Sequence, residues 1–420
     1  MLRRFRVKGF KSLLDAELEL APLVVLMGPN AAGKSNLLEA LLLLSKLVTE
    51  QTLTEAFAPP LRGYPLEAFS LPDQGLEGLL RKDKAELALE AIVQPAPGTK
   101  PAPERLHYRV AVRIQPKTGS LEVSDEYLAR LKRDGTPKQK PRIEREGAAL
   151  IVRRLTEAGA PRHEPLELNH TLASNRQLSG EDRYPDFDRL RGELSAWQTY
   201  YLDPRLAMRE PQPPREVTDI GPRGEWIAPF LHRLKENEAH RKYFLAIGRA
   251  LRRAIPTVEG LDVDLDPRRG ILDIVIRQDG TPFSSRVVSE GTLRVLALCC
   301  LAGNPWPGEL VAFEEPENGV HPRRIEVIAD LLAAMAERGR SQVVVTTHSP
   351  PLIAAMLRRA RAAPDSIKIF SCSQSGRATQ VRAFEPMGPV FDDHEIRKSL
   401  TGPEDAEVVE AMLLRGWLDG

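Results

Sequence analysis

One short loop places the tightest limit on how this chain can fold. Residues 28–35 read Gly-Pro-Asn-Ala-Ala-Gly-Lys-Ser, which satisfies G-x-x-x-x-G-K-[ST]. The apolar run at residues 23–27 predicts a buried strand before the loop, and residues 36–48 predict a helix after it. A glycine-containing loop between strand and helix is typical of phosphate sites, because backbone N–H groups and the helix N-terminus face the anion. An ordinary glycine-rich turn is the alternative.

The residue types in the loop follow from such a ligand. Lys34 would supply a point charge to the β and γ phosphates, and Ser35 a hydroxyl for Mg²⁺. The residues expected to line the nucleotide are Gly28, Pro29, Asn30, Ala31, Ala32, Gly33, Lys34, Ser35 and Asn36.

Two adjacent acids, Glu314 and Glu315, end an apolar run that predicts a second buried strand. Neighbouring side chains on an extended chain point to opposite sides, so the two acids are expected to do different work. One would help to hold Mg²⁺ through water, and the other would face the attacking water as base or polariser. A solvated strand end is the alternative.

Two further segments carry candidate phosphate contacts. His348 follows the apolar run 342–346, at the strand end where open α/β sheets place their ligands, although a lone histidine is more often structural. Ser289 and Gly291 precede the apolar run 295–301, where they form either a helix N-cap or a phosphate contact.

Composition and hydrophobic pattern along the chain predict an α/β protein with a mixed sheet, divided into four regions. Residues 1–94 form an N-terminal lobe with the loop, and residues 95–255 a β-rich and helical insertion marked by many prolines. Residues 256–371 return to strand and helix alternation as a C-terminal lobe, and residues 372–420 form a tail.

Charge and composition exclude several classes of protein. No apolar run reaches the roughly 18 to 20 residues that span a bilayer, so we expect a cytoplasmic protein without a membrane partner. The three cysteines lack metal-site spacing and are expected to be buried. With 59 Lys+Arg against 58 Asp+Glu, nucleic-acid binding would need a local patch. Residues 130–142, with six Lys or Arg and one Asp, could provide it, or could be a solvated hairpin tip.

Taken together, GPNAAGKS, SEGTLR, FEEPENGVHP and TTHSP resemble, in this order, the ABC-type ATPase heads of the SMC, RecF and OLD group. The similarity is greatest to predicted bacterial AAA-family ATPases with an OLD-type head and no Toprim domain. The motifs cover about residues 1–50 and 285–355. Two departures stand out. Glu314 replaces the usual aspartate, and S-E-G-T replaces the transporter signature. No pattern of long coiled-coil arms is present.

The resemblance implies a role for each motif. Residues 28–35 would be the Walker A loop, Glu314 the Walker B acid, Glu315 the catalytic glutamate and His348 the switch histidine. Lys34 would neutralise developing charge. Ser289 and Gly291 would reach the γ-phosphate bound by a second subunit, which implies an ATP-dependent, head-to-tail homodimer or a higher oligomer.

The family context also implies a biological setting. It suggests an ATPase acting on DNA in repair or anti-phage defence, with a nuclease or other effector protein as partner. The alternative is a slow nucleotide-gated switch or scaffold that holds a partner protein without acting on DNA.

Overall fold

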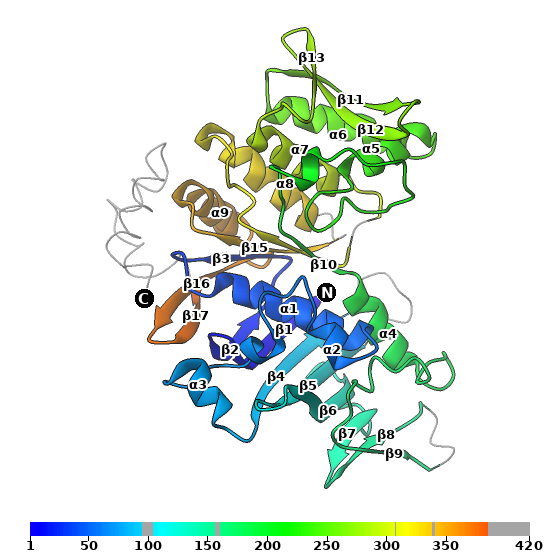
Figure 1. The fold of residues 1–420 in the computed structure, drawn as a ribbon, viewed down its shortest axis with the longest axis vertical. Coiled ribbons are helices and arrows are strands. Elements are labelled where there is room, and N and C mark those ends of the chain that lie inside the picture. The colour runs from blue at the N-terminus through cyan, green and yellow to red at the C-terminus, as the bar shows by residue number, and fades with distance from the viewer. Residues whose placement is uncertain (95–103, 156–159, 307, 338–340, 385–420) are drawn as a thin grey trace. The chain divides into compact units, whose positions relative to one another are not determined.

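The computed structural model describes residues 1–94, 104–155, 160–306, 308–337 and 341–384. The chain divides into two compact units. The first contains residues 1–21, 29–197 and 371–383, and the second contains residues 22–28 and 198–370 together with residue 384 onward. Each unit is described below by itself (Figure 1).

The first unit is built on an eight-stranded sheet with the order β2-β1-β4-β5-β6-β7-β8-β9. Its strands are β1 (Leu2–Phe10), β2 (Leu13–Glu19), β4 (Ala85–Val93), β5 (Arg105–Gln115), β6 (Ser120–Leu131), β7 (Ile143–Glu146), β8 (Ala149–Val152) and β9 (Arg162–Pro165). Burial alternates along β4 and β5, as expected for an antiparallel sheet with one covered and one solvated face.

Helix α1 (Lys34–Thr49) belongs to this unit and is buried along most of its length. It packs against α4 (Pro185–Ser195) and the short α2 (Leu53–Ala56). Two small elements, η1 (Pro65–Ala68) and α3 (Gly75–Leu80), complete the helices of the unit.

A six-stranded sheet has the order β10-β14-β15-β3-β16-β17. Its strands are β10 (Trp197–Tyr200), β14 (Leu310–Glu314), β15 (Gln342–Thr347), β3 (Leu23–Met27), β16 (Ile367–Ser375) and β17 (Ala378–Phe384). The three strands β14, β15 and β3 are parallel, and β3 and β15 are buried at every residue. Continuous burial suits a parallel sheet that is covered on both faces.

Helices and a smaller sheet complete the second unit. The helices are α5 (Ile227–Glu236), α6 (Arg241–Ala254), α7 (Glu290–Ala302), α8 (Ile325–Glu337) and α9 (Pro350–Ala362), with η2 (Ala207–Arg209) and η3 (Pro322–Arg324). The three-stranded sheet contains β11 (Val258–Asp266), β12 (Ile271–Gln278) and β13 (Thr281–Ser284). Within the described residues, no helix is both long and apolar enough to cross a bilayer.

The α/β class with a mixed sheet is confirmed, but the two units divide the chain differently from the four regions expected. Glu90 of β4 pairs with Arg109 of β5, so the strands of the expected insertion continue the sheet of the N-terminal hairpin. Residues 198–255 belong to the other unit. Prolines and alternation identify local strands and turns, whereas strand pairing over long separations leaves no local pattern. Most of the expected tail lies outside the described residues.

Candidate functional site

The loop that the sequence predicts to bind phosphate ends at a helix N-terminus without a side-chain cap. Gly33 is the N-cap of α1 with φ 88°, and Ala31 also has a left-handed φ, of 67°. The first turn of α1 contains no acidic residue, so the positive end of the helix dipole is available to an anion. The Lys34 side chain is buried and its Nζ donates to the Pro29 carbonyl at 2.7 Å. These features fit a phosphate chain.

A small polar network holds this end of α1 in place. Asn36 Nδ2 donates to Ser12 Oγ at 2.7 Å, and Ser12 Oγ lies 2.6 Å from Thr379 Oγ1. The Thr379 N–H also donates to the Ser12 carbonyl at 2.8 Å. A Cβ on Gly33 would lie 1.9 Å from Thr379 Oγ1, so close packing as well as φ requires glycine here.

In the second unit, three parallel strands end at one edge of the sheet. Glu314 of β14 pairs with Thr346 of β15, and Thr347 pairs with Met27, the last residue of β3. The loop that begins at Gly28 follows directly in sequence. The carboxyl ends of parallel strands are where open α/β sheets bind their ligands. Glu314 therefore lies at the edge of the sheet where a ligand is expected to bind. Within the described residues, no group of three or more His, Cys, Asp or Glu side chains is placed to hold a metal ion.

Glu315 is held at both carboxylate oxygens. Oε1 lies 2.7 Å from His348 Nδ1, and Oε2 accepts from Asn318 Nδ2 at 2.6 Å. Its N–H donates to the Thr346 carbonyl at 3.1 Å. The backbone of Glu315 has a left-handed φ of 46°, which is costly for a residue other than glycine and is characteristic of functional sites. The side chains of Glu315 and His348 are 18% and 39% exposed, so water can reach the pair.

A second, buried acid lies beside this pair. Glu317 accepts a hydrogen bond from Thr347 Oγ1, and its other oxygen has no hydrogen-bond partner among the described residues. Burial raises the pKa of Glu317 above its ordinary value. On α7, burial lowers the pKa of Arg294, and the charge of Glu317 opposes that shift. The charge of Glu317 therefore offsets part of the cost of burying the Arg294 guanidinium.

The segment before α7 is tightly fixed. The Arg209 guanidinium donates to the Ser285, Arg286 and Val288 carbonyls. Ser289 then caps α7 by accepting from the Thr292 N–H at 3.2 Å. The N-cap interpretation of Ser289 is thus confirmed, while its expected contact with a second subunit stays a prediction.

Gly291 allows a close backbone approach at the first turn of α7. A Cβ at this position would lie 2.5 Å from the Gly319 carbonyl oxygen, which belongs to the loop after Glu315. Glycine is therefore required where the helix meets that loop.

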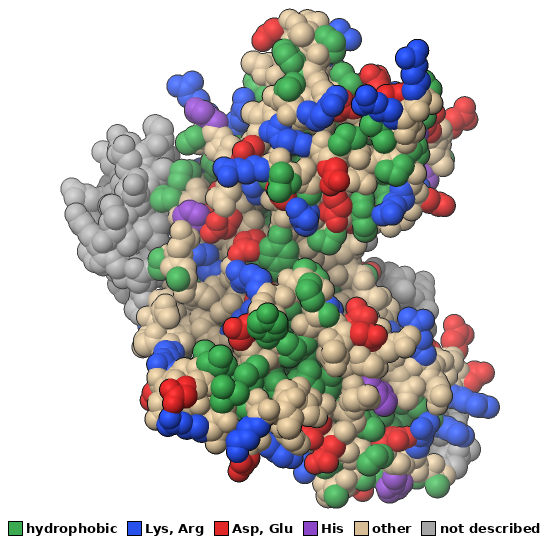
Figure 2. Space-filling model, viewed as in Figure 1, with side chains coloured by type: hydrophobic (Ala, Val, Ile, Leu, Met, Phe, Trp, Pro, Cys, Tyr) green, Lys and Arg blue, Asp and Glu red, His purple; other side chains and the backbone are tan. Residues whose placement is uncertain are grey.

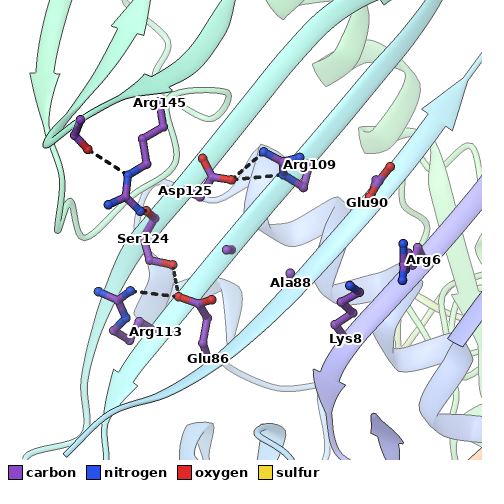
Figure 3. Close-up of a pocket in the computed structure, with 12 residues that line it drawn as sticks. Arg6, Lys8, Glu86, Ala88, Glu90, Arg109, Arg113, Ser124, Asp125 and Arg145 are labelled. Atoms are coloured by element: carbon purple, nitrogen blue, oxygen red, sulfur yellow. Dashed lines mark hydrogen bonds and ion pairs between the residues drawn. The ribbon is translucent and has the colours of Figure 1, made fainter. Parts of the chain in front are cut away.

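A groove of about 710 Å³ crosses the solvated face of the eight-stranded sheet (Figure 3). Its arginines are largely neutralised by neighbours. Arg109 pairs with Asp125 at 2.8 Å, and Arg113 pairs with Glu86 at 3.1 Å. Such cross-strand pairs stabilise a sheet and leave little net charge for an anion.

Half of the cations of the basic segment 130–142 pair with acids of the same protein. Arg130 and Arg142 both pair with Asp186, whose side chain is only 1% exposed. Lys138 pairs with Glu104. Three of the six cations that were candidates for contact with a phosphate backbone therefore form ion pairs within the protein.

Most of the expected site residues fall into local arrangements that suit their expected chemistry. In the first unit, the loop from Pro29 to Asn36 lies at the start of α1. In the second, Glu314, Glu315 and His348 lie at one sheet edge, with Ser289 and Gly291 at the start of α7.

Sequence reasoning missed several contributors. The hydrogen bond from Asn318 to Glu315 was not predicted, although the place of Asn318 three residues after Glu315 was a usable signal. Ser12 and Thr379 belong to none of the motifs. Glu317 and Thr347 lie within two of the motifs, but their hydrogen bond to each other was not predicted.

This fold and these strand ends are those of a P-loop ATPase head, and the fold is the one that a solved SMC head shares. The chain belongs to the family described as "AAA domain, putative AbiEii toxin, Type IV TA system", whose model matches residues 23–354. Membership implies ATPase chemistry in general terms.

Individual proteins are similar to this chain in fold or in part of the sequence. A solved SMC head bound to the C-winged helix domain of ScpA is similar over 91% of this chain and 98% of its own, with TM-score 0.54 and 14% identity. That likeness shows the fold alone. The SMC head domain from Thermotoga maritima matches 91% of this chain and 99% of its own at 15% identity, with TM-score 0.42.

The OLD nuclease of Thermus scotoductus is 49% identical over 41 residues, which is 10% of this chain. The match spans 8% of the length of that nuclease.

Proposed function

We propose that this chain binds ATP·Mg²⁺ on the loop 28–35 and hydrolyses it with Glu315 as the residue that polarises the attacking water. The observation that carries the proposal is the doubly held Glu315 carboxylate at the end of β14, in the same parallel sheet as the strand that leads into the loop. A carboxylate fixed in this way cannot rotate away from a water in line with the γ-phosphate, and such positioning is the main protein contribution to phosphoryl transfer.

The other residues have roles that follow from their chemistry. Lys34 neutralises charge on the β and γ phosphates, and the start of α1 supplies N–H donors. Ser35 and Glu314 provide a hydroxyl and a carboxylate, oxygen donors of the kind that Mg²⁺ takes alongside nucleotide phosphates. When bound, Mg²⁺ stabilises the negative charge that develops on the phosphates. His348 presents Nδ1 to Glu315, which leaves Nε2 to bond the γ-phosphate.

Two copies would act together, head to tail. Ser289 is solvent-exposed at the N-terminus of α7, where it can meet the γ-phosphate held by a second copy. ATP would then join two heads, and hydrolysis would release them. A higher oligomer would need a second contact, because a pair that shares two ATP molecules is closed.

We further propose that this ATP cycle serves a DNA transaction, in repair or defence against phage, together with a nuclease or other effector. Support comes from the local identity to an OLD nuclease and from the family description, which names a toxin of a type IV TA system. The alternative is a slow switch that holds a protein partner. The solved SMC head, which carries a bound domain of ScpA, supports that alternative.

ATP turnover and molecular mass test the ATPase proposal. Glu315→Gln should lower turnover by at least about 100-fold while ATP still binds, and ATP should then accumulate paired heads. Lys34→Ala should abolish both ATP binding and pairing. Unchanged turnover in Glu315→Gln would refute the assignment. Duplex DNA separates the two biological settings, because under the alternative it neither binds nor changes the rate.

A further inference from the structure

Helix α6 carries a concentration of positive charge that neither the motifs nor the proposed ATP site use. Its 14 residues include no Asp or Glu, and its five cations are all solvent-exposed: Arg241, Lys242, Arg249, Arg252 and Arg253. At about 100° per residue these five fall within an arc of about 120°. The buried residues Phe244, Ile247, Leu251 and Ala254 lie on the opposite side.

The cations of α6 have no ion-pair partners among the described residues, whereas many other Lys and Arg side chains of the described part of the chain do have one. Within the described residues, none of the five has a carboxylate within ion-pair distance, and only Lys242 has a recorded side-chain interaction, over the Tyr243 ring at 5.1 Å. By contrast, on α9 Arg358 pairs with Glu326, and Arg359 pairs with Asp330. On the face of the molecule that Figure 2 shows, Lys and Arg side chains are interspersed with Asp and Glu.

Helix stability does not explain this pattern. Arg252 and Arg253 in the last turn favour the helix dipole, but Arg241 and Lys242 occupy the first turn, where the dipole disfavours cations. Packing does not explain it either, because α6 contacts α5, α7 and β11 through its apolar side. The exposed charges therefore point to an external anion.

The spacing fits a phosphate backbone. Arg241 and Arg253 are about 18 Å apart along the helix axis, and one strand of B-DNA presents about five phosphates over that length. Four of the five cations are arginines, whose planar fork suits phosphate oxygens. Since the face has no exposed aromatic ring to stack on a base, the contact would not depend on sequence.

We infer that the exposed face of α6 binds the phosphate backbone of duplex DNA. This inference rests on the proposed DNA function and replaces residues 130–142 as the expected contact. The proposed partner of α6 is nucleic acid, and binding of an acidic protein instead would contradict the inference.

The test is the affinity of the full-length chain for a labelled duplex at several salt concentrations with ATP·Mg²⁺. The variant Arg241→Gln/Arg249→Gln/Arg252→Gln should bind at least about tenfold more weakly, and its salt slope should fall by about 2.7. The matched control Lys132→Gln/Arg133→Gln/Lys140→Gln removes the same charge from the segment 130–142 and should bind as the wild type does. Both variants should retain DNA-free ATP turnover, which verifies folding.

The possible results separate the two proposals. The inference is overturned if both variants lose the same DNA affinity, or if the α6 variant loses none. Either result leaves the proposed ATPase activity untouched. A wild-type protein that turns over ATP but binds no duplex overturns the inference and the DNA part of the proposed function. A protein that binds duplex through α6 without ATP turnover upholds the inference and refutes the ATPase. Competition by polyglutamate as effective as that of unlabelled duplex overturns the choice of nucleic acid.

Discussion

At the scale of single residues, Glu315 combines a strained backbone conformation with the proposed catalytic role. Its left-handed φ of 46° is worth about 1 to 3 kcal/mol of strain. The backbone bond to Thr346 and the contacts with His348 and Asn318 keep the residue in that conformation. The strain turns the chain sharply at the strand end, so that Glu314 and Glu315 need not follow the simple alternation expected from an extended strand.

Replacing Asn318 tests whether the second hold on Glu315 matters. Asn318→Ala should lower kcat about tenfold with little change in KM for ATP, because the carboxylate keeps His348 but gains rotational freedom. Asn318→Asp should be slower still, since like charges would face each other. Steady-state kinetics provide the measurement. If the Ala variant instead keeps its rate per dimer but fails to pair, the residue belongs to the interface.

At the scale of elements, β6 is joined to a distant loop by a buried acid. Glu126 of β6 accepts from Tyr108 Oη and from the Leu172 and Ala173 N–H groups. Thr171 in the same loop donates to the carbonyl of Leu47 on α1. This chain of bonds connects the sheet to the helix that follows the phosphate loop.

The same acid makes stability depend on pH. Burial raises the pKa of Glu126 from 4.5 to about 7, so the folded state holds a proton that the unfolded state releases. Stability should therefore fall as pH rises between about 4.5 and 7, by about 1.4 kcal/mol per unit, and level off above. Urea unfolding from pH 5 to 8 should show wild type losing stability relative to Glu126→Gln. A constant difference across that range would contradict the assignment.

How far the sequence predicts these elements depends on how local the signal is. The strand at residues 23–27 matched β3 residue for residue, because it is a continuous apolar run beside a motif. By contrast, Asp186 lies 56 residues from Arg130, and Thr379 lies 367 residues from Ser12. Polar partners so far apart carry no period or spacing. The sequence therefore could not predict that Arg130 pairs with Asp186, or that Ser12 and Thr379 support the loop at the start of α1.

At the scale of the whole molecule, near neutrality hides an uneven distribution of charge. Residues 385–420 contain nine acidic and three basic residues, so residues 1–384 hold 56 basic against 49 acidic. The part of the chain that includes α6 therefore has a formal charge of +7, which favours the approach of a polyanion.

The proposed pairing of heads predicts which exposed apolar residues matter. Leu206 and Val287 are each 70% exposed. Val287 precedes Ser289 by two residues, and Leu206 follows Arg205, which bonds Glu290 at 2.9 Å. Leu206→Glu/Val287→Glu should abolish ATP-dependent dimers while ATP affinity of the single head stays within about twofold. Light scattering with ATP measures the change, and Leu265→Glu, on β11, is the control. Dimers that persist in the double variant would exclude this face.

The place of β3 also has a consequence for biosynthesis. This strand leaves the ribosome before its neighbours in the sheet, β15 and β16, and Leu23 pairs with Val343, 320 residues later. The eight-stranded sheet needs nothing beyond Pro165 to complete its pairing. During synthesis, the five apolar residues of β3 therefore have no strand partners until residues 342–347 have been made. The delay exposes an aggregation-prone segment and makes a slow closing of this sheet the expected late step of folding.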